Sequence, residues 1–308
     1  MCLLIVLTAR LLVFRDTEPS EFGHPLSYWV EQIDVGPSTE SFLPAQRDGP
    51  KNAANAIAGL GTNALPWLIK WIRYKESPWR TKVADLAEKI PLELVQDYAE
   101  SHIRRPRAAA RARGAAKSIG MLGERAARAV PELARLVNEG APDMAVVAAY
   151  ALGPLGTNSL PVLLGVIRNR EHPCRRDCII ALSFMPGVTN VSSEVVPVLA
   201  ECVTDTTNAG VAELAVLVLG DLKGEPSISV PALVTGLKST DSSVRKSSAE
   251  ALMWFGRKAL IAIPALTNAL SDGSSDVRVS AGYALRQIAP EQFRDLEVEG
   301  DKRTLDKH

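Results

Sequence analysis

Residues 241–270 read DSSVRKSSAEALMWFGRKALIAIPALTNAL, and this stretch carries the pattern that decides the fold. Three apolar side chains stand seven, four and one residues before a glycine: Ala249, Leu252 and Phe255 before Gly256. These spacings place the three side chains on one face of an α-helix. Glycine often ends a helix because it adopts the left-handed conformation at no steric cost. The stretch therefore predicts a helix that buries one face and ends at Gly256.

The second half of the same stretch predicts another helix, which opens at Pro264. Proline suits the first helical turn because the amide hydrogen that it lacks would have no partner there. Leu266 and Leu270 lie four residues apart and share one helix face. A single pair of helices cannot bury both apolar faces, so neighbouring copies must stack on it.

The pattern recurs at a mean spacing of about 33 residues, which is typical of helix-pair repeats. The first helices should end at Gly61, Pro91, Gly123, Gly156, Pro186, Lys223, Gly256 and Ala289. The residue four positions before each end is apolar: Ile57, Ala87, Ile119, Leu152, Leu182, Leu219, Leu252 and Leu285. Second helices should open at Pro66, Pro131, Pro161, Pro197, Pro231 and Pro264. Leucine follows two residues after each proline: Leu68, Leu133, Leu163, Leu199, Leu233 and Leu266. The sequence therefore predicts an all-α protein of stacked helix pairs.

Two segments of the repeats resemble the HEAT-repeat family. Asp241–Arg245 (DSSVR) leads into AEAL, and Asp276–Arg278 (DVR) leads into GYAL. These entries and the Pro-x-Leu second helix are similar to HEAT repeats, notably the bacterial subtype named after phycobilisome lyase subunits. Over about residues 50–290, the resemblance implies a right-handed α-α superhelix, a HEAT-repeat solenoid of about seven to eight two-helix repeats. It also implies that Arg245 and Arg278 form structural ladders with acidic neighbours.

The composition excludes a strong overall electric field. Lys and Arg number 35, as do Asp and Glu, so no global charge draws the chain to nucleic acid or anionic membranes. Hydrophobic residues make up 46% and aromatic residues only 5%, which predicts a core of Ala, Leu, Val and Ile. Any charge preference must therefore be local.

The sequence predicts neither catalysis nor a cofactor. The four histidines are far apart and form no HExxH, and there is no GxSxG, Walker or GxGxxG motif. The cysteines are too few for a disulfide framework and lack the partners of a metal site, so we interpret them as small core residues. They are Cys2, Cys174, Cys178 and Cys202.

The chain is predicted to have four parts. Residues 1–18 form a signal-like or membrane-anchor leader, because Leu3 to Phe14 is mostly apolar but shorter than the ~20 residues of a membrane span. This leader is either a truncated signal or an amphiphilic segment that packs on the array; we favour the signal, and with it the cell envelope over the cytoplasm. A capping segment with a short helix follows at 19–48, with Trp29 and Ile33 covering the first repeat. The solenoid spans 49–290, and a polar C-terminal tail spans 291–308.

The repeat that ends at Pro91 is the least regular, and its second helix is predicted to run on to about His102. A basic run follows, which is either a solvated linker and helix face or an anion-binding patch. Its arginines are Arg104, Arg105, Arg107, Arg111 and Arg113. Three tryptophans precede this run: Trp67, Trp71 and Trp79. Each either packs in the core or contacts a ligand.

By the HEAT resemblance, second helices line a concave groove, into which the residues four and seven positions after each proline should point. The fourth residues are Lys70, Arg135, Gly165, Glu201, Thr235 and Asn268, and the seventh are Arg73, Asn138, Arg168, Thr204, Lys238 and Ser271. The groove should be basic in its N-terminal half and nearly neutral in its C-terminal half. The predicted partner-binding residues are Lys70, Arg73, Trp79, Arg104, Arg105, Arg107, Arg135, Arg168, Glu201 and Lys238.

These features favour a non-catalytic scaffold or adaptor that binds a protein in the groove. The first alternative is a nucleic-acid-binding protein that uses the Arg-rich N-terminal half. The second alternative, which the lyase-subtype resemblance implies, is chromophore attachment of the phycobilin-lyase kind.

Overall fold

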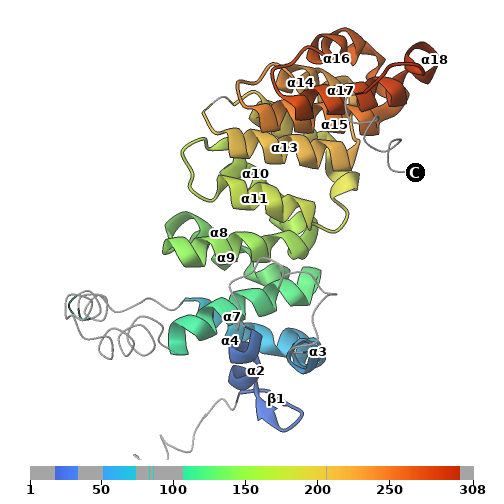
Figure 1. Cartoon of the computed structure of the whole chain (residues 1–308). Helices are drawn as coiled ribbons and strands as arrows, with labels where there is room; N and C mark the ends of the chain where they lie inside the picture. The colour runs from blue at the N-terminus through green and yellow to red at the C-terminus, as the bar shows by residue number, and fades with distance from the viewer. Residues whose placement is uncertain are drawn as a thin grey trace, which may run out of the picture. The chain divides into compact units, whose positions relative to one another are not determined.

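The computed structural model describes residues 18–33, 51–73, 83, 86, 107–205 and 207–298. Within these ranges the elements are helices, apart from one two-stranded sheet, and the predicted all-α fold is confirmed (Figure 1). The chain divides into two compact units, Met1–Leu155 and Gly156–His308. The predicted number of repeats stays a prediction, because the copy that ends at Pro91 lies outside the described residues.

The first unit opens with a hairpin and a short helix. Strand β1 (Ser20–Glu21) pairs antiparallel with β2 (His24–Pro25), and α2 (Leu26–Ile33) follows at once. Helix α2 packs on α3 and α7, and it buries Trp29 and Ile33 on that side. The indole Nε1 of Trp29 donates a hydrogen bond to the carbonyl oxygen of Glu21 at 3.0 Å, so this side chain also ties the hairpin to the helix.

The other elements of the first unit form stacked helix pairs. In chain order they are α3 (Lys51–Leu60), η2 (Gly61–Ala64), α4 (Leu65–Ile72), α7 (Arg107–Leu122), η4 (Gly123–Ala129), α8 (Val130–Glu139) and α9 (Pro142–Leu152). Both α3 and α4 pack on α7, and the 3₁₀ turns η2 and η4 touch each other. The α3–α4 pair therefore lies directly against the α7–α8 pair.

The second unit contains two layers of helices. After η5 (Gly153–Ser159), which spans the division, come α10 (Leu160–Arg168), α11 (Arg175–Ser183), η6 (Val188–Val191), α12 (Ser192–Val203), α13 (Ala209–Leu222), α14 (Pro226–Gly236), α15 (Ser242–Phe255), η7 (Gly256–Ala262), α16 (Ile263–Ala269), α17 (Ser275–Ile288) and α18 (Pro290–Phe293). First helices α11, α13, α15 and α17 pack in succession, and second helices α10, α12 and α14 do the same (Figure 1).

The predicted helix ends are confirmed where the backbone turns left-handed. Gly61, Gly123 and Gly256 follow α3, α7 and α15 with φ of +54°, +59° and +54°. Lys223 also has a positive φ, +50°, after α13, although a side chain is rarely found there. A break in the chain direction thus separates the first helix of these pairs from the second.

Four of the six predicted proline openings are confirmed, and two are wrong. Pro66, Pro131, Pro161 and Pro264 lie in the first turn of α4, α8, α10 and α16. Pro197 and Pro231 instead lie inside α12 and α14, which begin earlier at Ser192 and Pro226. In these two copies the residues before the proline are already α-helical, so each ring removes one backbone hydrogen bond within its helix.

The predicted core positions are buried in the described repeats. The leucine two residues after each proline has no exposed surface: Leu68, Leu133, Leu163, Leu199, Leu233 and Leu266. The residues four positions before the helix ends are equally buried: Ile57, Ile119, Leu152, Leu182, Leu219, Leu252 and Leu285. Each such side chain contributes roughly 1.5–3 kcal/mol through burial, so the stacked pairs within each unit share an apolar interior.

The residues after α18 return to α17. Val298 is buried, and a Cβ added to Gly282 would lie 2.8 Å from its Cγ2. The guanidinium of Arg286 donates to the carbonyl oxygen of Leu296, with Nε at 2.9 Å. The start of the predicted polar tail therefore contributes an apolar contact that covers α17. Residues 299–308 lie outside the described part of the chain.

Of the described residues, Pro142–Arg168 is the one stretch long and apolar enough to pass as a single membrane span. It comprises α9, η5 and α10, and its backbone breaks at Gly156, where φ is +70° and ψ is −154°. Because 67% of its most apolar window is buried inside the protein, its apolar character is that of a core.

Candidate partner-binding surface

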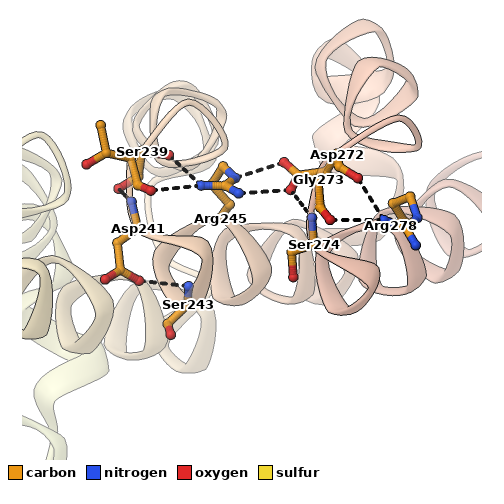
Figure 2. Close-up of polar contacts among 9 residues, drawn as sticks. Ser239, Asp241, Ser243, Arg245, Asp272, Gly273, Ser274 and Arg278 are labelled. Carbon is orange, nitrogen blue, oxygen red and sulfur yellow. Dashed lines mark hydrogen bonds and ion pairs between the residues drawn. The ribbon is translucent and has the colours of Figure 1, made fainter.

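A polar cluster around Arg245 in the second unit is structural. Arg245 makes a bidentate ion pair with Asp272, in which Nε and a terminal nitrogen each lie 2.8 Å from a carboxylate oxygen (Figure 2). A third nitrogen donates to the carbonyl oxygen of Ser239 at 2.9 Å. These bonds join α15 to the loop before α17, and the ladder that the HEAT resemblance implies for Arg245 is confirmed.

Arg278 contributes to the same cluster through the backbone. Its guanidinium donates to the carbonyl oxygens of Asp272 at 2.8 Å and Gly273 at 3.3 Å (Figure 2). The hydrogen bond from Arg245 lowers the pKa of Asp272 below its ordinary value and outweighs the opposite effect of burial. This carboxylate is therefore fixed in its charged form and is engaged in stacking the repeats.

A third arginine, Arg175, also joins neighbouring helices, and it was not predicted from the sequence. Arg175 stands eleven residues before the expected helix end Pro186, the same spacing that separates Arg245 from Gly256. Its side chain is buried against the buried carboxylate of Asp205, and its Nε donates to the carbonyl oxygen of Ile167 at 2.7 Å. Because Cys174 stands before Arg175 where Val244 stands before Arg245, the Val-Arg motif is incomplete and only the spacing could have revealed this pair.

The solvent-facing side of the second helices agrees with the predicted positions. The residues four and seven positions after the prolines are exposed, apart from half-buried Arg135. They are Lys70, Arg73, Asn138, Gly165, Arg168, Glu201, Thr204, Thr235, Lys238, Asn268 and Ser271. These positions therefore form the side of the second helices that a partner could reach.

In the first unit this side is basic but partly neutralised. Glu132 of α8 lies 2.6 Å from a terminal nitrogen of Arg135 and 3.4 Å from Nε of Arg73 in α4. The hydrogen bond from Glu132 raises the pKa of Arg135 above its ordinary value. The carboxylate thus pairs with two of the predicted binding arginines, one from each helix pair.

Two tryptophans lie beside these cations. Trp67 and Trp71 of α4 are half-exposed, with ring centroids 6.1 Å apart and planes tilted by 52°. Lys70 Nζ lies 5.1 Å from the Trp67 ring centroid, and Arg111 Cζ lies 5.4 Å from that of Trp71. At these distances a cation is attracted to the face of an indole ring. Arg111 is itself held by Glu31 of α2, with Nε 3.1 Å from the carboxylate oxygen.

The exposure of Trp71 is unusual for its position in the repeat. Residues five positions after the opening proline are small or aliphatic in the other described second helices, and they are buried there: Leu136, Val166, Cys202, Gly236 and Ala269. In α4 this position carries the largest side chain, and part of its ring faces solvent. We name Trp67, Lys70, Trp71, Arg73 and Arg111 the cationic tryptophan surface.

This surface contains two of the predicted binding residues, Lys70 and Arg73. Arg168, Glu201 and Lys238 belong to the second unit, where they are exposed. Arg107 begins α7, while Trp79, Arg104 and Arg105 lie outside the described residues. Trp67 and Trp71 are sequence-predicted candidates, and Arg111 belongs to the predicted basic run. The sequence did not predict that Arg111 lies over Trp71, or that Glu31 and Glu132 pair with the arginines.

The cysteines that the structure describes belong to the core. Cys174, Cys178 and Cys202 are free and buried, and burial raises the pKa of each thiol. A raised pKa keeps a thiol protonated and poorly reactive. Within the described ranges, no three His, Cys, Asp or Glu side chains are grouped so that they could hold a metal ion.

The stacked helix pairs and their arginine ladders define an α-helical repeat protein. Residues 196–286, which run from α12 to α17, match the family model described as HEAT repeats, so this part of the chain is similar to HEAT repeats. The match does not extend to the phycobilisome-lyase subtype. No curated protein matches the sequence. Among solved structures, the crystal structure of an engineered protein is similar at 20% identity, covering 70% of this chain and 98% of that chain, with a TM-score of 0.42.

Proposed function

We propose that this chain is a non-catalytic adaptor that binds another protein on the exposed side of its second helices. HEAT repeats typically mediate protein binding, and α12 to α17 are similar to them. The observation that carries the proposal is the cationic tryptophan surface, where two indole rings are left half-exposed beside cations. Tryptophan and arginine are the residues most enriched among those that dominate protein interfaces.

The geometry also indicates why a binding role suits this surface better than a structural one. A tryptophan that served only the core would be covered like Leu136 and Val166, which are 4% exposed at the equivalent positions. The energy of burying the rest of each ring is instead available to a partner. The paired arginines reduce the side-chain ordering that binding would otherwise require.

We further propose that the protein acts at the cell envelope. The support is the apolar segment Leu3 to Phe14, whose composition is typical of a signal or a membrane anchor. Fractionation of cells that express the full chain tests this proposal. Recovery in the soluble cytoplasmic fraction alone would contradict it.

A pull-down with the full chain as bait tests the binding proposal. We expect that Arg73→Glu combined with Arg135→Glu reduces partner recovery at least tenfold, because both charges reverse beside Glu132. Ser271→Glu is the matched control, since Ser271 is exposed and stands seven residues after Pro264 just as Arg73 stands seven after Pro66. Arg168→Glu extends the test to the second unit.

Two results would overturn the assignment of this surface. If every recovered partner still bound the Arg73→Glu, Arg135→Glu variant, the docking site would lie elsewhere. If the recovered material were nucleic acid, with affinity falling steeply as salt rises, phosphate contacts would replace protein contacts as the function. Circular dichroism of each variant shows whether the helices are intact.

A further inference from the structure

We infer that the cationic tryptophan surface binds an acidic, extended peptide segment that carries a bulky apolar side chain. This inference rests on the proposed function and specifies the chemistry of the partner. It is carried by three features that meet on α4: the local charge, the half-exposed indole rings and the way in which the cations are held.

The helices that carry this surface have charged residues of one sign. Residues 51–73 and 107–122, which form α3, η2, α4 and α7, contain seven Lys and Arg residues and no Asp or Glu. The described carboxylates that contact the surface come from other helices, Glu31 of α2 and Glu132 of α8. Glu31 pairs with Arg111, and Glu132 pairs with Arg73 and Arg135, while neither contacts Lys70. Among the described residues the surface therefore keeps a net positive charge, which attracts an acidic partner.

The apolar part of the surface has the size of a peptide side chain rather than of a folded domain. Helix α4 has 8 residues and is therefore about 12 Å long. An extended peptide covers that length with about four residues. Trp67 and Trp71 stand one turn apart on this helix, so an aliphatic or aromatic side chain laid between them would bury part of both rings.

The arrangement fits a peptide better than a nucleic acid. A base held between two aromatic side chains needs rings that are nearly parallel, whereas these planes are tilted by 52°. Lys70 and Arg111 also occupy a face of Trp67 and Trp71, where a base would stack. Arg73 and Arg111 already contact carboxylates, which shows that both guanidinium groups accept this ligand type in this setting.

Selection from a random library of displayed 12-residue peptides on the full chain tests the inference. We expect the recovered peptides to be enriched in Asp and Glu and to share at least one large apolar residue. Synthetic copies of the best peptides are then titrated by fluorescence anisotropy. Trp67→Ala should weaken binding by about 30-fold, and Lys70→Glu by about tenfold, as for residues at the centre of an interface.

Thr235→Glu is the matched control, because Thr235 stands four residues after Pro231 as Lys70 stands four after Pro66. It should leave the affinity unchanged. Lys70 is exposed, so Lys70→Glu keeps the test valid if Trp67→Ala disturbs the helix. A twenty-residue oligothymidylate serves as the competing probe, and we expect it not to displace the peptide.

Three outcomes would overturn the inference. In the first, the recovered peptides are neutral or basic. In the second, acidic peptides bind the Lys70→Glu variant as tightly as the native chain. Either result would show that the ligand is not acidic, while a protein-binding function could still hold. Displacement of the peptide by oligothymidylate would assign the surface to nucleic acid. Failure of the proposed function is a separate result, because it requires that no pulled-down protein depend on Arg73 and Arg135.

Discussion

Replacing Arg175 with alanine is expected to lower the free energy of unfolding by about 3–5 kcal/mol, because it leaves a buried carboxylate without its partner. The side chains of Arg175 and Asp205 are only 6% and 0% exposed. The arginine also donates to the carbonyl oxygen of Ile167 at 2.7 Å and to Sγ of Cys202 at 3.3 Å. Urea denaturation followed by circular dichroism measures the change.

The exposed pair of Arg257 and Glu291 provides the control. These side chains are 72% and 50% exposed, so Arg257→Ala should change the stability by less than about 0.5 kcal/mol. The double variant Arg175→Met, Asp205→Leu should be less destabilised than Arg175→Ala, since no charge is left buried. An Arg175→Ala variant as stable as Arg257→Ala would contradict the structural role of the pair.

The same pair sets the acid sensitivity of the second unit. Burial alone would raise the pKa of Asp205, but hydrogen bonds from Thr207 and Arg175 outweigh it and lower the pKa to about 2, from an ordinary value of 3.8. A carboxyl group with a lowered pKa stabilises the fold above its unfolded pKa and loses that effect as pH falls. This contribution should therefore be lost between about pH 4 and pH 2, less steeply in Arg175→Ala.

The Gly114→Ala variant is expected to lose about 1–3 kcal/mol of stability, because the added methyl group has no room. A Cβ at Gly114 would lie 2.2 Å from the carbonyl oxygen of Val30 and 3.0 Å from its Cγ1. Helix α2 would have to move away from α7, which would uncover Trp29. Thermal unfolding measures the loss, and a red shift of tryptophan emission would report the exposed ring.

Gly165→Ala gives the opposite expectation at a similar residue. Gly165 lies in α10, and nothing lies within 4 Å of a Cβ placed there. Alanine is favoured over glycine in a helix by up to about 1 kcal/mol, so this variant should be as stable as the native chain or more so. If Gly114→Ala also stabilised the protein, the close contact of α2 with α7 would be wrong.

Most of the helical framework could be predicted from the sequence, because its signals are local and repeated. The leucines after the prolines and the glycines at the helix ends are defined by a spacing that a single helix imposes. The two wrong openings, at Pro197 and Pro231, show the limit of this reasoning. Proline is compatible with the first turn of a helix but does not mark where the helix begins. The conformation of the residues before the proline determines that position.

The site could be predicted only in part, because its decisive contacts join residues far apart in the chain. Spacing within α4 correctly placed Lys70 and Arg73 on the exposed side. It could not reveal that Arg111 lies over Trp71, or that Glu132 holds Arg73, since both contacts depend on how α4 packs on its neighbours. The buried pair of Arg175 and Asp205 was missed for the same reason.

Site-specific photocrosslinking tests the central claim most directly. A benzophenone side chain placed at Lys70 or Asn138 lies on the exposed side of α4 or α8, and one at Asn268 or Ser271 lies at the equivalent positions after Pro264. Illumination with the pulled-down partner should give a crosslinked protein from the first pair at least tenfold more strongly than from the second. Crosslinking confined to Asn268 and Ser271, or absent from all four positions while the partner stays bound, would contradict the claim that this surface is the docking site.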